Sequence, residues 1–169
     1  PVWAHVQTPG NIMRVRPTPD GGGVTYLFTY GLGKDGPDPE LVSVGWDGSE
    51  RSRTTIEGIT HDFVFLDDGA VAFPKIEWRS YAEYSQLVEG EGIVERTAEG
   101  VETTVWSSFD YWDPRTDGEV AADGDWTHAN ALDFDPELGV YGIGFNGMDA
   151  ILRVERASGR VISQVGGLD

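Results

Sequence analysis

The 169-residue sequence contains no cysteine, which excludes disulfide frameworks and thiolate metal sites. It also contains no run that approaches the roughly 18 consecutive apolar residues of a membrane-spanning helix. We therefore expect a protein without a membrane span. With no cysteine to interpret, the redox compartment cannot be inferred from this residue type.

Basic residues are scarce. Lysine and arginine together number 12 against 29 aspartates and glutamates, which gives a formal net charge of -17 and a pI near 4.3. Phosphate backbones and anionic lipids require a cationic face, so nucleic acid is excluded as a partner. Acidic surfaces of this strength occur in salt-adapted or secreted proteins, and they also occur as ordinary solvated exteriors.

Helical apolar spacing is nearly absent. Only residues 81–88 carry it, and we expect one or two helical turns there. In contrast, the chain has 23 glycines and 9 prolines. Strong turn signals stand at Asp20-Gly21, Asp47-Gly48, Asp68-Gly69 and Asn146-Gly147. These features predict an all-β fold of about twelve short antiparallel strands.

The predicted strands group into repeats of about forty residues. The most regular repeat has its expected strands at 128–134, 140–145, 151–154 and 161–165. Four antiparallel strands in this length are typical of one β-propeller blade. Blade-like repeats are expected at about 11–57, 61–109 and 126–167. We therefore predict a partial β-propeller of about three blades over residues 1–169.

Two histidines occupy equivalent positions in successive repeats. Thr60-His61-Asp62-Phe63 follows the same pattern as Thr127-His128-Ala129-Asn130, with each histidine just before an alternating apolar strand. The first strand of every propeller blade lines the central channel, so His61 and His128 are expected to converge there. The third histidine, His5, lacks this context and is interpreted as an ordinary surface or turn residue.

A long loop at residues 110–125 separates the last two repeats and is rich in aspartate and aromatic residues. Its carboxylates do not match the ligand spacing of an EF-hand, so a lid or substrate-facing insertion is favoured over a calcium site. Trp112 and Trp126 flank this loop and could line a site for a flat ring. The alternative interpretation is structural packing.

The repeats resemble a known family. Residues 125–136 (DWTHANALDFDP), followed by 141–145, 149–155 and 159–167, resemble a blade of the bacterial arylsulfate sulfotransferases, and residues 60–63 resemble the preceding blade. The resemblance implies half of a six-bladed propeller. It also implies an enzyme that moves a sulfuryl group from an aryl sulfate to a phenol without a cofactor, in a periplasmic or secreted location.

The resemblance further implies roles for individual residues. His61 and His128 would bind or polarise the sulfate as catalytic residues, with Asn130 binding substrate beside them. Asn146 and, from its position beside the loop, Trp126 are the other expected substrate-binding residues. Asn146 stands where the family pattern carries an arginine, and an amide lacks the fixed positive fork that holds sulfate. The histidine that takes the sulfuryl group would lie in a following blade, so the sequence is expected to be a fragment without it.

Two other classes stay open. A non-catalytic binding or interaction propeller would use both histidines as structural donors. A quinone-cofactor or metal-dependent oxidoreductase would require aspartates and glutamates to cluster with the histidines around an ion. In every case three blades cannot close a ring, so exposed sheet edges make self-association possible.

Overall fold

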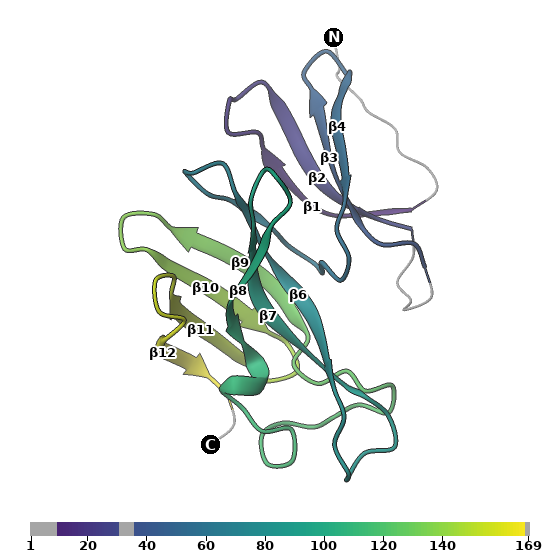
Figure 1. Cartoon of the computed structure of the whole chain (residues 1–169), viewed down its shortest axis with the longest axis vertical. Coiled ribbons are helices and arrows are strands. Elements are labelled where there is room, and N and C mark those ends of the chain that lie inside the picture. Colours follow the sequence, from purple (N-terminus) through teal and green to yellow (C-terminus); the bar gives the residue numbers. More distant parts are fainter. Residues whose placement is uncertain (1–9, 31–35, 168–169) are drawn as a thin grey trace. The chain divides into compact units, whose positions relative to one another are not determined.

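The computed structural model describes residues 10–30 and 36–167 of an all-β chain (Figure 1). The described residues form three four-stranded antiparallel sheets, each with its strands in sequence order, which is the arrangement of a propeller blade. The prediction of an all-β fold with three such sheets is confirmed. The chain divides into two compact units, Pro1–Asp62 and Phe63–Asp169.

The strand bounds are as follows. The first sheet comprises β1 (Asn11–Pro17), β2 (Gly23–Thr29), β3 (Glu40–Gly45) and β4 (Glu50–Thr55). The second comprises β5 (Val64–Phe65), β6 (Val71–Arg79), β7 (Val88–Arg96) and β8 (Glu102–Ser107). The third comprises β9 (Ala129–Asp135), β10 (Val140–Phe145), β11 (Ala150–Glu155) and β12 (Val161–Gly166).

The prediction of one or two helical turns at residues 81–88 is wrong. That stretch forms turns closed by a single bond from Tyr84 N to Tyr81 O at 3.3 Å, and Val88 already begins β7. The two tyrosine rings instead meet edge to face at 6.4 Å. Within the described residues the only helical element is a short 3-10 turn, η1 (Ser108–Asp110).

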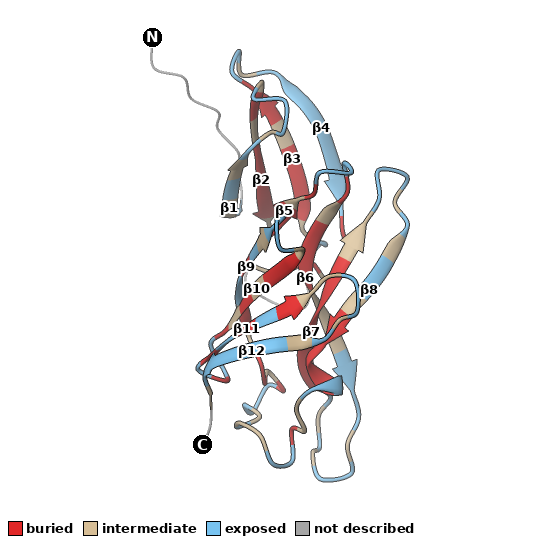
Figure 2. Ribbon diagram, turned by 90° about the vertical axis from the view of Figure 1, so that its left-hand side faces the viewer, coloured by how far each residue is buried: buried red, intermediate tan, exposed pale blue. Residues whose placement is uncertain are grey.

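The first unit has its own small core. Tyr26, Phe28, Val42 and Val44 from the two central strands pack together and are nearly inaccessible to solvent. β4 lies at the edge of this sheet and is exposed along its whole length (Figure 2). Its six residues are all polar or charged, which suits an edge strand because polar side chains discourage pairing with another chain.

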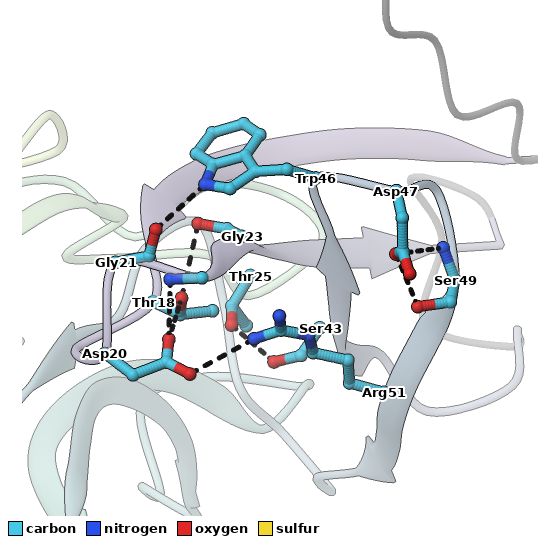
Figure 3. Close-up of polar contacts among 11 residues, drawn as sticks. Thr18, Asp20, Gly21, Gly23, Thr25, Ser43, Trp46, Asp47, Ser49 and Arg51 are labelled. Carbon is cyan, nitrogen blue, oxygen red and sulfur yellow. Dashed lines mark hydrogen bonds and ion pairs between the residues drawn. The ribbon is translucent and has the colours of Figure 1, made fainter.

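The turns of the first sheet are fixed by aspartates (Figure 3). Asp20 accepts hydrogen bonds from Gly22 N at 2.9 Å and from Arg51 Nη1 at 3.1 Å, and Asp47 accepts one from Ser49 N at 3.0 Å. Trp46 is half exposed and donates its indole N–H to Gly21 O at 2.8 Å. These hydrogen bonds close the turns at Asp20-Gly21 and Asp47-Gly48, which explains why strands end at both Asp-Gly pairs.

In the second unit, two sheets share one continuous core. The third sheet points alternate residues of β10 and β11 into this core, among them Ile143 and Leu152, and the second sheet contributes Ile93 and Trp106. The Trp106 and Phe145 rings lie 5.6 Å apart, so Trp106 packs between the two sheets. This packing fixes β9 beside β5 and β6 within the unit.

A partly buried polar network also joins these two sheets. Arg156 donates to Glu95 through Nε at 2.8 Å and Nη2 at 2.7 Å, and to Asp68 Oδ2 at 2.8 Å. Tyr141 is fully buried and donates its hydroxyl to Glu95 Oε1 at 2.7 Å. Burial alone would raise the pKa of Glu95, but the bonds from Arg156 and Tyr141 outweigh it and keep that pKa below its usual value.

The other face of the third sheet is open to solvent. Ile151 and Val165 pair across β11 and β12 and are 56% and 69% exposed. A side chain added at Gly142, on the same face, would meet nothing within 4 Å. Among the described residues, no helix is both long and apolar enough to cross a membrane.

Candidate functional site

The candidate site in the second unit is built where residues 124–127 run beside β7. Glu89 N donates to Gly124 O at 2.7 Å, and Trp126 N donates to Glu89 O at 3.1 Å. This contact is possible because β8 ends opposite Gly92 and leaves the first half of β7 without that neighbour. The segment therefore reaches His128 with its backbone already fixed.

His128 itself has a left-handed backbone, with φ of 50°. Its carbonyl oxygen accepts a hydrogen bond from Asn146 N at 3.0 Å, and Gly147 N donates to Thr127 O at 3.1 Å. The turn at Asn146 and Gly147 thus clamps the backbone of the histidine. A side chain at Gly147 would place its Cβ 2.1 Å from Trp126 O, so this close approach requires glycine.

Asn130 occupies a β-bulge. In the pairing of β9 with β10, Ala129 faces Phe145 and Ala131 faces Gly144, which leaves Asn130 as the extra residue. Bulges redirect a side chain and are frequent beside functional sites. Asn130 is exposed two residues after His128. The structure therefore brings three predicted site residues, His128, Asn130 and Asn146, to the same end of the third sheet.

Asp125 holds the imidazole of His128. The distance from His128 Nδ1 to Asp125 Oδ2 is 2.5 Å, and the two side chains are 37% and 26% exposed. Partial burial by itself would lower the pKa of His128, but the hydrogen bond and charge of Asp125, aided by Glu91 and Glu89, outweigh it and raise that pKa above its usual value. Asp125 therefore stabilises the cationic form of the ring relative to that of an unperturbed histidine.

A second pair of side chains, Thr127 and Glu91, lies beside the pair of Asp125 and His128. Glu91 is 2% exposed, accepts a hydrogen bond from Thr127 Oγ1, and donates its backbone N–H to the same Thr127 oxygen at 3.2 Å. Burial raises the pKa of Glu91 to about 7, against the opposing hydrogen bond from Thr127, with added repulsion from Asp125 and Glu89. Glu91 thus exchanges a proton near neutral pH.

The carboxylates also come close to one another. One oxygen each from Glu89, Glu91 and Asp125 lies within 4.8 Å of the others, a spacing that oxygen ligands of a divalent cation would accept. This is the kind of clustering that a metal-dependent oxidoreductase would need. However, Thr127 and His128 already donate to two of the three carboxylates. The arrangement fits a hydrogen-bonded support for His128, and we assign no cation to it.

Trp126, predicted to contact substrate, is 1% exposed. Its indole packs against Phe109 at 5.2 Å and donates to Asp117 O at 2.7 Å. It reaches a ligand only if this loop opens, so its binding role stays a prediction. Trp112 packs against Phe145 at 5.2 Å, in agreement with the alternative interpretation of structural packing.

His61 lies in the first unit. Its φ of 51° matches that of His128, so the two histidines have the same unusual backbone conformation, as expected of equivalent positions in a repeat. The neighbouring Asp62 is 1% exposed and is held by Arg14 through Nε and Nη2, both at 2.8 Å, and by Arg16 Nη2 at 3.2 Å. Convergence of His61 with His128 stays a prediction. His5 lies outside the described residues.

Sequence reasoning did not single out Asp125, Thr127 or Glu91 as parts of the site. A usable signal was the stretch at residues 88–94, where glutamates alternate with glycines inside a strand bounded by valine and isoleucine. Charged residues in a strand that is buried from Val88 to Val94 require partners. Residues 124–127, which lie beside the first half of β7, are distant from it in sequence and show no apolar periodicity.

Comparison with known proteins identifies the family of this chain. The family profile described as Arylsulfotransferase (ASST) matches residues 27–166. No curated protein and no solved structure gave a significant match. The profile covers β3 to β12, including His61 and the entire His128 site. The chain belongs to the arylsulfotransferase family.

Proposed function

We propose that this protein transfers a sulfuryl group from an aryl sulfate ester to a phenol, with His128 and His61 binding and polarising the sulfate. Family membership supports the reaction class. The observation that carries the proposal is the contact of His128 Nδ1 with Asp125, which favours an imidazolium beside the exposed Asn130. Cations and amide donors fixed in place are what a sulfate requires.

The proposed reaction is balanced without a cofactor. The bond from sulfur to the aryl oxygen of the donor breaks, and its electron pair stays on that oxygen. A new bond forms from sulfur to the phenolic oxygen of the acceptor, whose proton passes to the departing phenolate. Negative charge grows on the leaving oxygen and on the sulfuryl oxygens, and hydrogen bonds from imidazolium side chains stabilise it.

A transfer assay tests the proposal. Nitrophenyl sulfate as donor and phenol as acceptor should give nitrophenol and phenyl sulfate in equal amounts, measured by chromatography. His128→Ala should lower kcat/KM by about 100-fold or more, the usual effect of removing one donor to a developing charge. Glu137→Gln, an exposed change in the turn between β9 and β10, should leave it unchanged. Nitrophenol without phenyl sulfate, or an unaffected His128→Ala variant, would contradict the proposal.

The second candidate is a binding module without turnover, and Asn146 favours it. This residue stands where the family pattern has an arginine, and asparagine offers no positive fork for sulfate. A binding module would take up aryl sulfate through His128 and release it unchanged. Asn146→Arg distinguishes the two candidates, because a residual enzyme should gain transfer rate from the restored cation while a binding module should gain affinity alone.

We also propose a periplasmic or secreted location, supported by the family resemblance and by the acidic composition. Fractionation of the native host tests this assignment. Recovery of the protein with cytoplasmic markers would overturn it.

A further inference from the structure

We propose that Asp125 is a positioning residue for His128, which fixes the orientation and protonation of the ring so that the imidazole presents Nε2 to the anionic group of the substrate. This inference rests on the proposed function for the identity of the substrate. The contact itself does not depend on that function, because it is a property of the folded second unit.

The first argument is geometric. Asp125 Oδ2 lies 2.5 Å from His128 Nδ1, so the proton on Nδ1 is shared with a carboxylate. A neutral imidazole carries one proton, and a carboxylate acceptor at Nδ1 keeps that proton there. Nε2 is then the nitrogen through which the ring addresses a substrate, as donor when the ring is charged and as base when it is neutral.

The second argument concerns how well Asp125 is held. Its backbone lies beside Glu89 in a parallel bridge, and its carbonyl oxygen accepts a bond from Ala121 N at 2.8 Å. The residue three positions later, His128, is clamped by the turn at Asn146 and Gly147. Both ends of the contact therefore have a fixed backbone, which makes the geometry reproducible rather than incidental.

The third argument concerns the surrounding charges. The groups that act on His128 are Asp125 from its own segment and Glu91 and Glu89 from β7, all of them acidic. Glu91 is tied through Thr127 and exchanges its own proton near neutral pH. The hydrogen bond and charge of Asp125 raise the pKa of His128 more than the charges of Glu91 and Glu89 do, so removing Asp125 should affect the ring most.

Histidine NMR provides a direct test, because the protein contains three histidines in all. With histidine labelled in both ring nitrogens, His128 is assigned by its loss in His128→Ala. The wild-type ring should be protonated at Nδ1 at neutral and alkaline pH and should titrate above the ordinary value of about 6.5. Asp125→Asn should lower the pKa of His128 by about one pH unit or more and remove the preference for Nδ1. The exposed Glu137→Gln change should alter neither.

Activity gives the functional readout. Asp125→Asn should lower kcat at least tenfold with a smaller change in KM, and should shift the alkaline limb of the pH profile to lower pH. Asp125→Glu keeps the carboxylate and should recover part of both effects. A wild-type His128 without a proton on Nδ1, or an Asp125→Asn variant that folds with an unchanged His128 titration, would overturn the proposal.

The outcomes separate the two proposals. If the NMR results are as expected but wild-type protein forms no phenyl sulfate, the positioning contact stands and the transfer function fails. If transfer occurs but Asp125→Asn alters neither the titration of His128 nor the pH profile, the function stands and the positioning role fails. If the Asp125→Asn variant does not fold, the positioning role is still tested by the position of the ring proton in wild-type His128 and by the titration of His128 in Asp125→Glu.

Discussion

The buried Glu91 side chain should make the free energy of unfolding depend on pH, and replacing it with glutamine should remove that dependence. The pKa of Glu91 is raised from 4.5 to about 7 in the folded protein. A raised carboxyl pKa means that the folded state holds the proton more tightly, so stability falls as pH rises from 4.5 to about 7 and is constant above. Each pH unit in this window costs about 1.4 kcal/mol, which gives about 3 kcal/mol in total.

The assay is urea unfolding followed by tryptophan fluorescence at pH values from 4.5 to 8.5. Between the two ends, the wild type should lose about 3 kcal/mol more than Glu91→Gln, because glutamine accepts the Thr127 bond at every pH. His128 also loses its contribution as pH rises through its raised pKa. Because Asp125 causes more of that shift than Glu91 does, most of this contribution is common to both proteins and cancels in the difference. The exposed Glu137→Gln change should follow the wild type. Parallel curves for wild type and Glu91→Gln would refute the burial of an ionisable group at this position.

Three further predictions follow from contacts elsewhere in the chain. Tyr141→Phe removes the hydroxyl bonded to Glu95 and should lower the free energy of unfolding by about 1 kcal/mol, measured from the urea midpoint; an unchanged midpoint would contradict the network. Gly147→Ala should destabilise by about 2 kcal/mol or more and displace the His128 signals, while Gly142→Ala, with open space around it, should do neither; equal effects would count against the tight turn. The open face of the third sheet should promote self-association, which Val165→Lys should reduce in light scattering; a monomeric wild type at high concentration would argue against it.

Strand positions were predictable where apolar alternation met a defined turn. Residues 140–145 were expected as a strand and form β10 (Val140–Phe145), since Asn146-Gly147 closes one end. In contrast, β4 (Glu50–Thr55) carries no apolar residue, so apolar alternation could not locate it. The first strand after His61 was expected to be regular and is only the two residues of β5.

The candidate site was predictable in part. The repeat of Thr-His predicted that the two histidines are equivalent, and their shared left-handed backbone agrees with this. Asp125 was assigned to an acidic loop, because nothing in the local pattern indicates that residues 124–127 pair with β7. Contacts between segments 35 residues apart or more depend on tertiary packing, as the bond between Glu91 and Thr127 illustrates, and periodicity contains no information about them.

The claim that His61 and His128 bind one anion is tested most directly by titrating the histidine-labelled protein with sodium sulfate. Both ring signals should move with the same dissociation constant, the affinity should fall as pH rises and the rings lose their protons, and His61→Ala should weaken the response of His128 about tenfold or more. Sulfate that moves only one of the two rings, or an affinity for His128 unchanged by His61→Ala, would contradict a shared site.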